Sequence, residues 1–519
     1  MRRTHARGAS FALSALTAAL LTASPAQAQQ ANIFDDLLLK LRDKGVLTED
    51  EYETLKAART EERTEQRVER RQQALKQAQA TEKEEKAKED AKTGLLGKFN
   101  NGFTWETADK KNSITVSGRV QLDYRSFSPE GATGTPAQSG TTTANGFDVR
   151  RAYLGLQGRV WEYYTFDVTG NFASTSGTNQ SGSQSNSHLD VAWLNAEWFK
   201  PAQLRLGQFK MPYSMEELTS SRFIDYTERS LLNQFVPAKE VGAMVWGAPW
   251  TGTFYGLALS NGQGQNGDEV SSVADGADFI GRVGANFAEM LGQKDNIYHL
   301  AFDYTDGNLA TSSNGASGNL ISVRTEGRGM TFFQVANSSF TGAKLERERI
   351  GLEGALAFGP LKLQAEWMQA GFSGTSVAGV GYDRNVDVYY VSAGWWITGE
   401  SWASAYRNGA FGRIIPKNNL RMGEPGLGAL MLGLRYSHLD GSDFKTSNPA
   451  GTGRLAAGFT NKADAYTAGL TWIVAPNLRF YLDYIQTEYD TPVTITPTGG
   501  AATTTDNEKA INFRAGIDF

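Results

Sequence analysis

In one stretch of the chain, residues 205–242, basic and acidic side chains that could attract or repel an ion are interleaved with apolar ones. Pro212 and Pro237 bracket its central part. Because proline fixes φ and removes a backbone donor, a regular sheet ladder is expected to stop at both. A connection this long and of mixed polarity is usually functional or disordered. Between positions 208 and 242 the basic residues are Lys210, Arg222, Arg229 and Lys239, and the acidic residues are Glu216, Glu217, Asp225, Glu228 and Glu240.

The N-terminus has the features of an export signal. Arg2, Arg3 and Arg7 precede a short apolar stretch, and Ala26-Gln27-Ala28 fits a small-x-small cleavage site. We therefore predict a signal peptide over residues 1–28 and a mature chain that begins at Gln29. The chain has no cysteine, which excludes a disulfide framework and suits passage through an oxidising periplasm.

Residues 29–98 are predicted to form a helical segment in the periplasm. Residues 33–44 have apolar side chains at helical spacing, Gly45 can end that helix, and Thr48 with Glu51 is typical of a capping box that opens a second helix over residues 52–58. Residues 60–92 are almost entirely charged residues, glutamine and alanine. Two interpretations stay open for this part: a solvated, helical or partly disordered spacer, and a trimeric coiled coil.

Residues 99–519 have the pattern of a membrane-spanning barrel. After the signal, no window approaches the roughly 18 uninterrupted apolar residues of a transmembrane helix, so only a barrel could cross a membrane. Segments of alternating polarity recur instead, separated by links rich in Gly, Asn, Ser and Asp. The clearest lie at residues 119–125, 153–159, 164–172, 361–368, 430–436, 478–484 and 509–519.

The links and the last strand refine this prediction. Short links at residues 358–360 and 475–477 resemble periplasmic turns, whereas residues 128–146, 174–187 and 492–507 resemble external loops. The length of the region corresponds to about 16 antiparallel strands. The chain ends on Phe519 after a strictly alternating strand, as outer-membrane barrels commonly do. We therefore predict an all-β outer-membrane barrel whose loop at residues 208–242 folds into the lumen and narrows it.

Alternation also predicts which arginines point into the lumen: Arg119, Arg151, Arg159, Arg205, Arg282 and Arg435. Rings of arginine and lysine line anion pores because fixed positive charge offsets partial dehydration of the ion. The alternative for each arginine is an ion pair with an acidic residue on a neighbouring strand.

The stretch GQFKMPYSMEELTSSRFIDYTERS from Gly207, together with FDVRRAYLGLQG at residues 147–158, resembles the phosphate-selective porin O/P family. The resemblance covers about residues 102–519. It implies a sixteen-stranded homotrimeric porin with its third external loop folded inward, and it implies passage of inorganic anions such as phosphate or polyphosphate. By this resemblance Arg150 and Arg151 belong to an arginine ladder, and Lys210, Arg222 and Arg229 to the constriction, where we also place Lys239.

Net charge does not establish anion selectivity. The loop carries more acidic than basic residues, and the whole chain has a formal charge of −5. We expect Glu216, Glu217 and Glu228 to pair with arginines of the barrel wall and hold the loop in place. Two other functions stay open: a general or cation-preferring porin of the same fold, and a structural protein that tethers the outer membrane.

Other classes are less compatible with the sequence. The mature chain has three scattered histidines, His188, His299 and His438, and none adjoins a recognisable serine nucleophile motif, so we expect no enzyme, metal site or cofactor. The charge gives no indication of a nucleic-acid partner. We expect contact with outer-membrane lipid and lipopolysaccharide in a Gram-negative bacterium, and a periplasmic or cell-wall partner for the helical segment.

Overall fold

A computed structural model describes residues 25–93, 95–99, 101–134, 143–173, 188–262, 264–265, 277–314, 318–497 and 500–519. The chain divides into two compact units, of which the second is Leu95–Phe519. This boundary lies four residues before the predicted start of the barrel at residue 99. The predicted signal peptide falls mostly on residues 1–24, outside the described residues.

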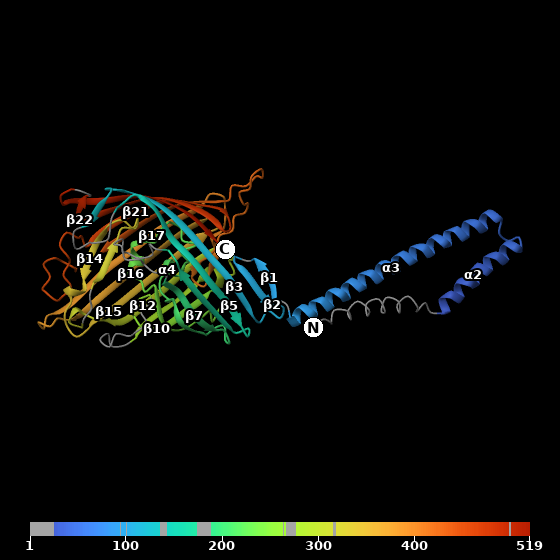
Figure 1. The fold of residues 1–519 in the computed structure, drawn as a ribbon, viewed down its shortest axis with the longest axis horizontal. Helices are drawn as coiled ribbons and strands as arrows, with labels where there is room; N and C mark the ends of the chain where they lie inside the picture. Colours follow the sequence, from blue (N-terminus) through green and yellow to red (C-terminus); the bar gives the residue numbers. More distant parts are fainter. Residues whose placement is uncertain are drawn as a thin grey trace, which may run out of the picture. The chain divides into compact units, whose positions relative to one another are not determined.

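The first unit is a pair of helices, α2 (Pro25–Asp43) and α3 (Glu49–Thr93) (Figure 1). The predicted capping box is present, because the backbone N–H of Thr48 donates to Glu51 at 2.9 Å and that of Glu51 donates to Thr48 Oγ1 at 3.4 Å. Leu38 of α2 and Tyr52 of α3 are buried, and Arg59 of α3 forms an ion pair with Asp35 of α2 at 2.7 Å. Helix α3 continues far beyond residue 58, so the charged stretch is helical. None of the described helices is long and apolar enough to cross a membrane.

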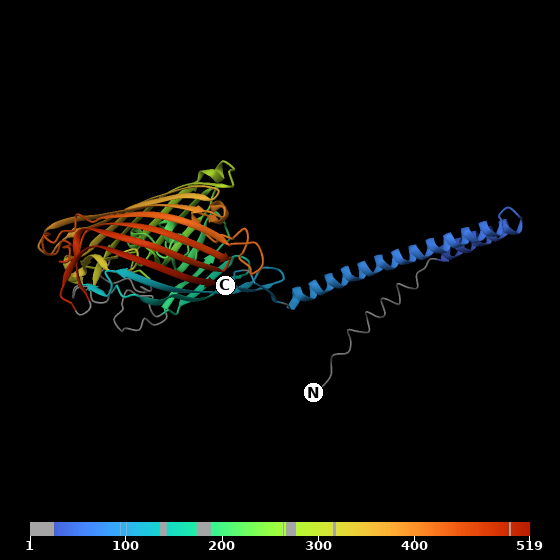
Figure 2. The same ribbon diagram turned by 90° about the horizontal axis from the view of Figure 1, so that it is seen from above.

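The second unit is a closed antiparallel barrel of sixteen strands within the described residues (Figures 1 and 2). The ring closes where β23 pairs with β3, with Phe513 opposite Tyr124. In order around the barrel the strands are β3 (Ser113–Ser128), β5 (Gly146–Val160), β6 (Tyr164–Asn171), β7 (His188–Ala196), β8 (Gln203–Lys210), β9 (Lys239–Gly247), β10 (Thr253–Ser260), β11 (Asp278–Asn286), β12 (Asn296–Leu309), β15 (Leu345–Phe358), β16 (Leu361–Thr375), β17 (Gly381–Trp396), β20 (Ala429–Asp440), β21 (Lys462–Ala475), β22 (Leu478–Pro497) and β23 (Thr503–Asp518).

The alternation of the strands is inverted relative to a soluble protein. On β22, Leu482 and Tyr484 are 48% and 44% exposed, whereas Asp483 between them is fully buried. An apolar outer face and a polar inner face are what a barrel surrounded by lipid requires. The same alternation recurs on β3, where Val120 and Leu122 are exposed and Gln121 is buried.

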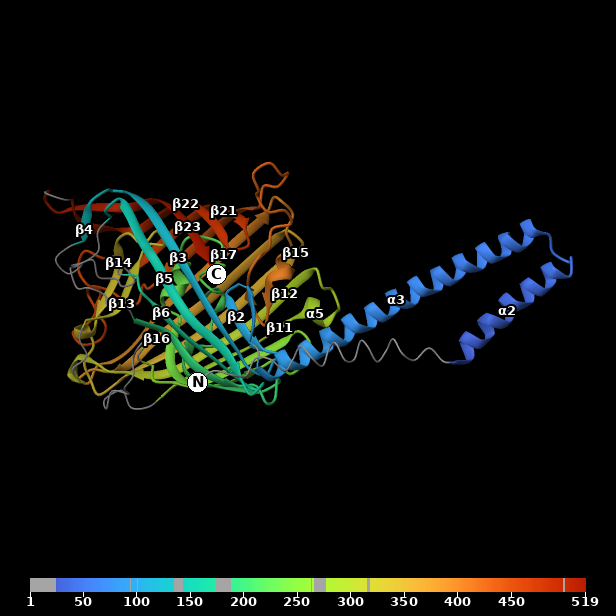
Figure 3. The same ribbon diagram turned by 45° about the vertical axis from the view of Figure 1, so that its right-hand side comes forward.

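Shorter strands and helices lie at the two ends of the barrel and in its connections. Strand β2 (Phe103–Thr107) pairs with β1 (Leu95–Phe99) and with β3, and β4 (Ala132–Gly134) pairs with β22. Figure 3 shows the hairpin of β13 (Asn319–Arg324) and β14 (Thr331–Ala336), which belongs to the β12–β15 connection. The remaining short elements are α4 (Met215–Leu218), α5 (Phe287–Met290), η2 (Leu231–Gln234), η3 (Ser312–Asn314), η4 (Asn337–Ser339), η5 (Trp402–Ala405), β18 (Tyr406–Arg407) and β19 (Ala410–Phe411).

The connections differ in length at the two ends of the barrel. The predicted short links at residues 358–360 and 475–477 lie at one end, here called the short-turn end, and the β3–β5 and β6–β7 connections lie at the other, the long-loop end. Two features differ from the sequence prediction. Residues 492–507 are mostly strand, because β22 and β23 extend into them. At the short-turn end, a long connection joins β17 to β20. This connection, residues 397–428, is called the closing segment.

Candidate functional site

The connection between β8 and β9, residues 211–238, folds into the lumen and is called the inward loop. The side chain of Ser214 donates to Glu366 of β16 at 2.6 Å, and the backbone N–H of Thr227 donates to Asp483 of β22 at 2.6 Å. Strands β16 and β22 lie far around the ring from β8 and β9. The loop therefore crosses the lumen, as the sequence predicted, because buried carboxylates of the opposite wall bind its backbone and hydroxyl groups.

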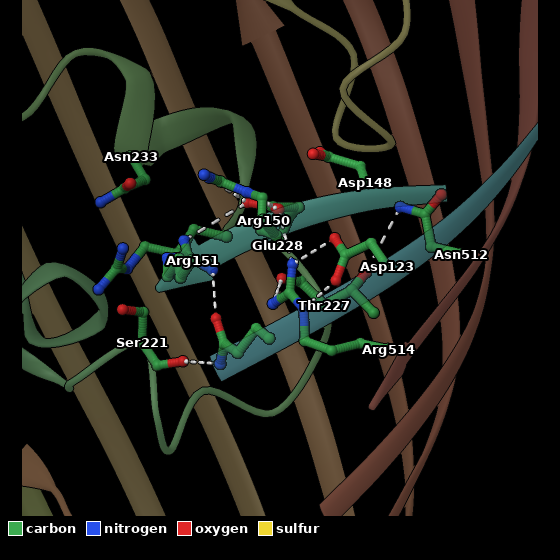
Figure 4. A network of polar contacts seen from close by, with 12 residues as sticks. Asp123, Asp148, Arg150, Arg151, Ser221, Thr227, Glu228, Asn233, Asn512 and Arg514 are labelled. Atoms are coloured by element: carbon green, nitrogen blue, oxygen red, sulfur yellow. Dashed lines mark hydrogen bonds and ion pairs between the residues drawn. The ribbon is translucent and has the colours of Figure 1, made fainter. Parts of the chain in front are cut away.

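Glu228 of the inward loop anchors the centre of this crossing (Figure 4). Its carboxylate accepts from Arg150 Nε at 2.7 Å and from Arg514 Nη2 at 2.9 Å, and Arg125 and Arg151 lie at 3.5 and 3.9 Å. These five residues are called the Glu228 cluster. A buried carboxylate surrounded by guanidinium groups is favourable only when the hydrogen bonds are this complete.

Arg150 and Arg151 both point into the barrel although they are adjacent in sequence. The pairing of β3 with β5 shifts here, since Gln121 lies opposite Arg151 and Leu122 opposite Val149. Arg150 is the extra residue of a β-bulge, which re-aims a side chain that strict alternation would turn outward. Both residues are buried against Glu228 and Gln121. The predicted ladder arginines are thus placed inside the lumen, but their charges are used to hold the loop.

A second anchor lies beside the first. Arg435 of β20 donates to Glu326, which belongs to the turn between β13 and β14, at 2.7 Å, and lies 3.4 Å from Glu216. The backbone N–H of Leu231 also donates to Glu326, at 3.2 Å. The β12–β15 connection therefore also reaches into the lumen, where it packs against the inward loop. The sequence analysis missed this, because Glu326 and Arg435 are 109 residues apart.

The expected pairing of the loop glutamates is confirmed for Glu216 and Glu228. Glu217 pairs with Lys210 of β8 and with Arg229 of the loop itself, at 3.4 Å each. Arg229 in addition donates to the carbonyl oxygens of Glu216, Glu217 and Thr219. Its role in the structure is to hold the loop's fold.

Beside the inward loop lies a cavity of about 460 Å³ between the loop and the wall formed by β3 and by β5 to β11. Six basic residues and two acidic residues line it. The basic residues are Arg119, Arg205, Lys210, Arg222, Lys239 and Arg282, and the acidic residues are Asp167 and Asp190. None of the five acidic residues of the 208–242 stretch is in this lining. The lining therefore holds more basic than acidic residues, although the stretch as a whole does not.

Three of the six cations have no carboxylate oxygen within 4 Å among the residues that the structure describes. Arg119 donates to Ser221 Oγ at 2.8 Å, Arg205 lies against two indole rings, and Arg222 projects from the loop. The other three are paired: Lys210 with Glu217, Lys239 with Asp190, and Arg282 with Glu353. Arg119, Arg205 and Arg222 are called the free guanidinium groups below.

Arg159, another predicted ladder residue, lies outside the cavity lining. It is at the short-turn end of β5, its side chain is 43% exposed, and it lies 3.8 Å from Glu197. Arg159 lies near the end of β5 and therefore beyond the cavity, whereas Arg119 and Arg151 lie nearer the middle of their strands. Arg514, which no prediction assigned to the site, completes the Glu228 cluster from the last strand.

The closing segment covers the lumen at the short-turn end. Trp402 Nε1 donates to the carbonyl oxygen of Pro360 at 3.0 Å, and the backbone N–H of Phe411 donates to Thr219 of the inward loop at 3.2 Å. Arg413 forms an ion pair with Asp518 of β23. Asn408 and Ala410 contribute to the cavity lining. The path past the free guanidinium groups is thus narrowed by the inward loop and by this segment.

Comparison with known proteins places this architecture among porins. The family described as phosphate-selective porin O and P matches residues 114–503. Porin O of Pseudomonas aeruginosa is 26% identical over 414 residues, which cover 76% of this chain and 87% of that protein. An uncharacterized protein of Caulobacter vibrioides is 36% identical over 100 residues, 19% of this chain and 17% of that protein.

Two solved structures align with the barrel. The anion-selective porin from Comamonas acidovorans has a TM-score of 0.47 and 13% identity, over 79% of this chain and 100% of that chain. The outer membrane channel DcaP of Acinetobacter baumannii has a TM-score of 0.47 and 10% identity, over 79% of this chain and 97% of that chain. Because the family match extends over most of the sequence and the fold is a closed barrel, the chain belongs to the phosphate-selective porin O and P family and is a channel of the Gram-negative outer membrane.

Proposed function

We propose that small anions cross the barrel through the cavity beside the inward loop, and that the free guanidinium groups select them. The observation that carries this proposal is the separation of charge by the loop. Glu216 and Glu228 of the loop are paired with arginines of the wall, whereas the cavity lining holds six basic and two acidic residues. Fixed cations in a narrow, partly dehydrated passage lower the energy of an anion and raise that of a cation.

Phosphate is the anion that we place first in this pathway. The guanidinium group presents donors in a planar fork that matches two oxygens of a phosphate. Arg119, Arg205 and Arg222 all line the same cavity, so that one tetrahedral oxyanion could meet more than one of them. The family description and the relative Porin O support this choice. Lys210 and Lys239 add charge to the lining while paired with carboxylates.

The zero-current potential of the purified protein in a planar bilayer tests the proposal. Under a KCl gradient, we expect the zero-current potential to have the sign of an anion-selective pore. We also expect added phosphate to reduce the chloride current. A potential of the opposite sign would overturn the proposal and favour a cation-preferring porin. An anion-selective potential with no effect of phosphate would restrict the proposal to anions in general.

The assembly and its orientation belong to the same proposal. We infer a homotrimer in which the short-turn end of the barrel faces the periplasm, and we place the helical unit in the same compartment after removal of residues 1–28. The apolar outer face, for example Leu434 at 65% and Leu257 at 49% exposure, is suited to lipid and to neighbouring subunits. Native mass spectrometry of the detergent-extracted protein is expected to show three copies of a chain that begins at Gln29. A monomer, or a chain retaining Met1, would contradict these assignments.

A further inference from the structure

Aromatic rings are the second component of the cavity wall. Seven aromatic residues line this space among the described residues: Tyr153, Trp193, Phe209, Phe223, Trp246, Phe254 and Tyr255. They come from β5, β7, β8, β9, β10 and the inward loop. These seven residues are called the aromatic wall. A passage evolved only for a small hydrated ion has no evident use for so many rings, because the ring faces offer that ion no hydrogen bonds.

The rings are arranged around the cations. The guanidinium carbon of Arg205 lies 4.3 Å from the centre of the Trp193 ring and 4.8 Å from that of Trp246. Its Nε is buried with no hydrogen-bond partner among the described residues. The guanidinium of Arg119 lies 4.0 Å over Tyr153. Stacking of this kind fixes the direction of a guanidinium group without using its hydrogen-bonding edge.

Trp193 and Trp246 are only partly buried, and their surroundings hold them in place. Trp246 Nε1 donates to Asn195 at 2.8 Å, and both rings pack against the apolar core formed in part by Phe209 and Met244. The rings are thus ordered surfaces that line the cavity. The volume of about 460 Å³ lies in the range typical of pockets for small organic molecules.

These features distinguish two classes of anion. For inorganic phosphate, contact with indole and phenyl rings replaces water without replacing its hydrogen bonds, which is unfavourable. For an anion with a carboxylate and an aromatic ring, the carboxylate can pair with a free guanidinium while its ring packs on the aromatic wall. The carboxylate and the ring of such a molecule can thus both form favourable contacts in the same cavity.

We propose that the cavity binds small aromatic monocarboxylates during their passage, with the carboxylate at Arg205 or Arg119 and the ring against Trp193 and Trp246. This inference rests on the proposed function, since it requires anions to enter the cavity. It extends the substrate class from inorganic oxyanions to organic anions of about the size of benzoate.

Block of the chloride current in planar bilayers tests this inference, with benzoate, cyclohexanecarboxylate and acetate as probes. We expect benzoate to block at a concentration at least about tenfold lower than acetate, since only benzoate can stack on the rings. Cyclohexanecarboxylate has a similar size and charge but no aromatic ring, and it is expected to block less well than benzoate. Equal block by all three, in a pore that is anion-selective, would overturn this inference and leave the proposed function intact. A cation-selective pore would overturn both.

A pair of tryptophan variants locates the binding site. Trp193→Leu is expected to raise the half-blocking concentration of benzoate about tenfold relative to that of acetate. Trp395→Leu is the matched control, because Trp395 lies on the outer face of β17 and is 48% exposed. The same loss in both variants, or in neither, would overturn the assignment to the cavity. If Trp193→Leu does not fold, Trp193→Phe keeps a ring and must retain the preference for benzoate, and the wild-type comparison of the three probes remains decisive.

Discussion

Replacing Arg222 by glutamine is expected to lower the anion-to-cation permeability ratio about tenfold. An ion about 4 Å from a unit charge in water-like surroundings interacts with it by about 1 kcal/mol. Screening at about 0.1 M salt, with a Debye length of about 10 Å, leaves about 0.7 kcal/mol. Loss of the charge removes this attraction for an anion and the equal repulsion for a cation. The total of about 1.4 kcal/mol corresponds to a factor of about ten.

The assay is the zero-current potential in a planar bilayer under a KCl gradient. Arg159→Gln is the matched control, because Arg159 also points inward but lies outside the cavity lining with its side chain 43% exposed. This variant is expected to retain the wild-type ratio. Arg222→Glu reverses the charge and is expected to lower the ratio about a hundredfold by the same Coulomb argument. At about 1 M salt the differences should shrink, because the Debye length falls to about 3 Å.

Two results would refute this reasoning. An unchanged ratio in Arg222→Gln would mean that ions do not pass within a few ångströms of this guanidinium. An equal change in Arg222→Gln and Arg159→Gln would mean that selectivity reflects the total charge of the barrel rather than the charges of the cavity. The first result would show that ions do not pass through the cavity. The second would show that the cavity does not determine ion selectivity.

Three further predictions concern what holds the site together. Glu228→Gln leaves buried guanidinium groups such as that of Arg514 without their full counter-charge, so the free energy of unfolding is expected to fall by about 3–5 kcal/mol, seen as a lower temperature of heat-induced unfolding on gels. Trp402→Ala leaves a cavity at a buried position of the closing segment, so the free energy of unfolding is expected to fall by about 3–5 kcal/mol. The single-channel conductance is expected to rise because the segment is held less firmly. Thr48→Ala removes the cap of α3 and is expected to destabilise that helix by about 1 kcal/mol, measured by circular dichroism at 222 nm during heating.

Each of these variants has a control on the protein surface. Glu162→Gln removes a carboxylate that is 48% exposed, Trp250→Ala an indole that is 74% exposed, and Thr54→Ala an exposed hydroxyl within α3. All three controls are expected to behave like the wild type. Unchanged unfolding in Glu228→Gln would contradict the anchoring role of the Glu228 cluster, and unchanged conductance in Trp402→Ala would show that the closing segment does not limit the path. Equal melting of α3 in Thr48→Ala and the wild type would argue against the capping box.

Local patterns predicted the barrel and its strands. The alternation at residues 119–125, 361–368 and 478–484 corresponds to β3, β16 and β22, because side chains of a strand point to opposite faces with a period of two. The same rule placed Arg119, Arg205 and Arg282 in the lumen correctly. Alternation failed where the backbone departs from the regular pleat. It predicted an inward Arg151 and could not predict that the bulge turns Arg150 inward as well.

The irregular parts were harder to predict. Gly, Thr and Pro at residues 492–507 suggested a loop, but pairing of β22 with β23 and with β4 makes most of this stretch extended. The closing segment has no sequence pattern that distinguishes it from an external loop. Its position follows from contacts with Pro360 and Asp518, which are far away in the chain.

The sequence by itself determined that this chain forms a barrel with an apolar exterior, a charged interior and a loop bracketed by two prolines, because these properties follow from the order of residues along each strand. It did not determine the sign of the pore's charge. Arg514 and Asp123 are 391 residues apart, and Glu228 lies 78 residues from Arg150. Only the closed tertiary structure brings such partners within hydrogen-bonding distance. That pairing neutralises the loop's glutamates and leaves Arg119, Arg205 and Arg222 in the cavity lining without a paired carboxylate among the described residues.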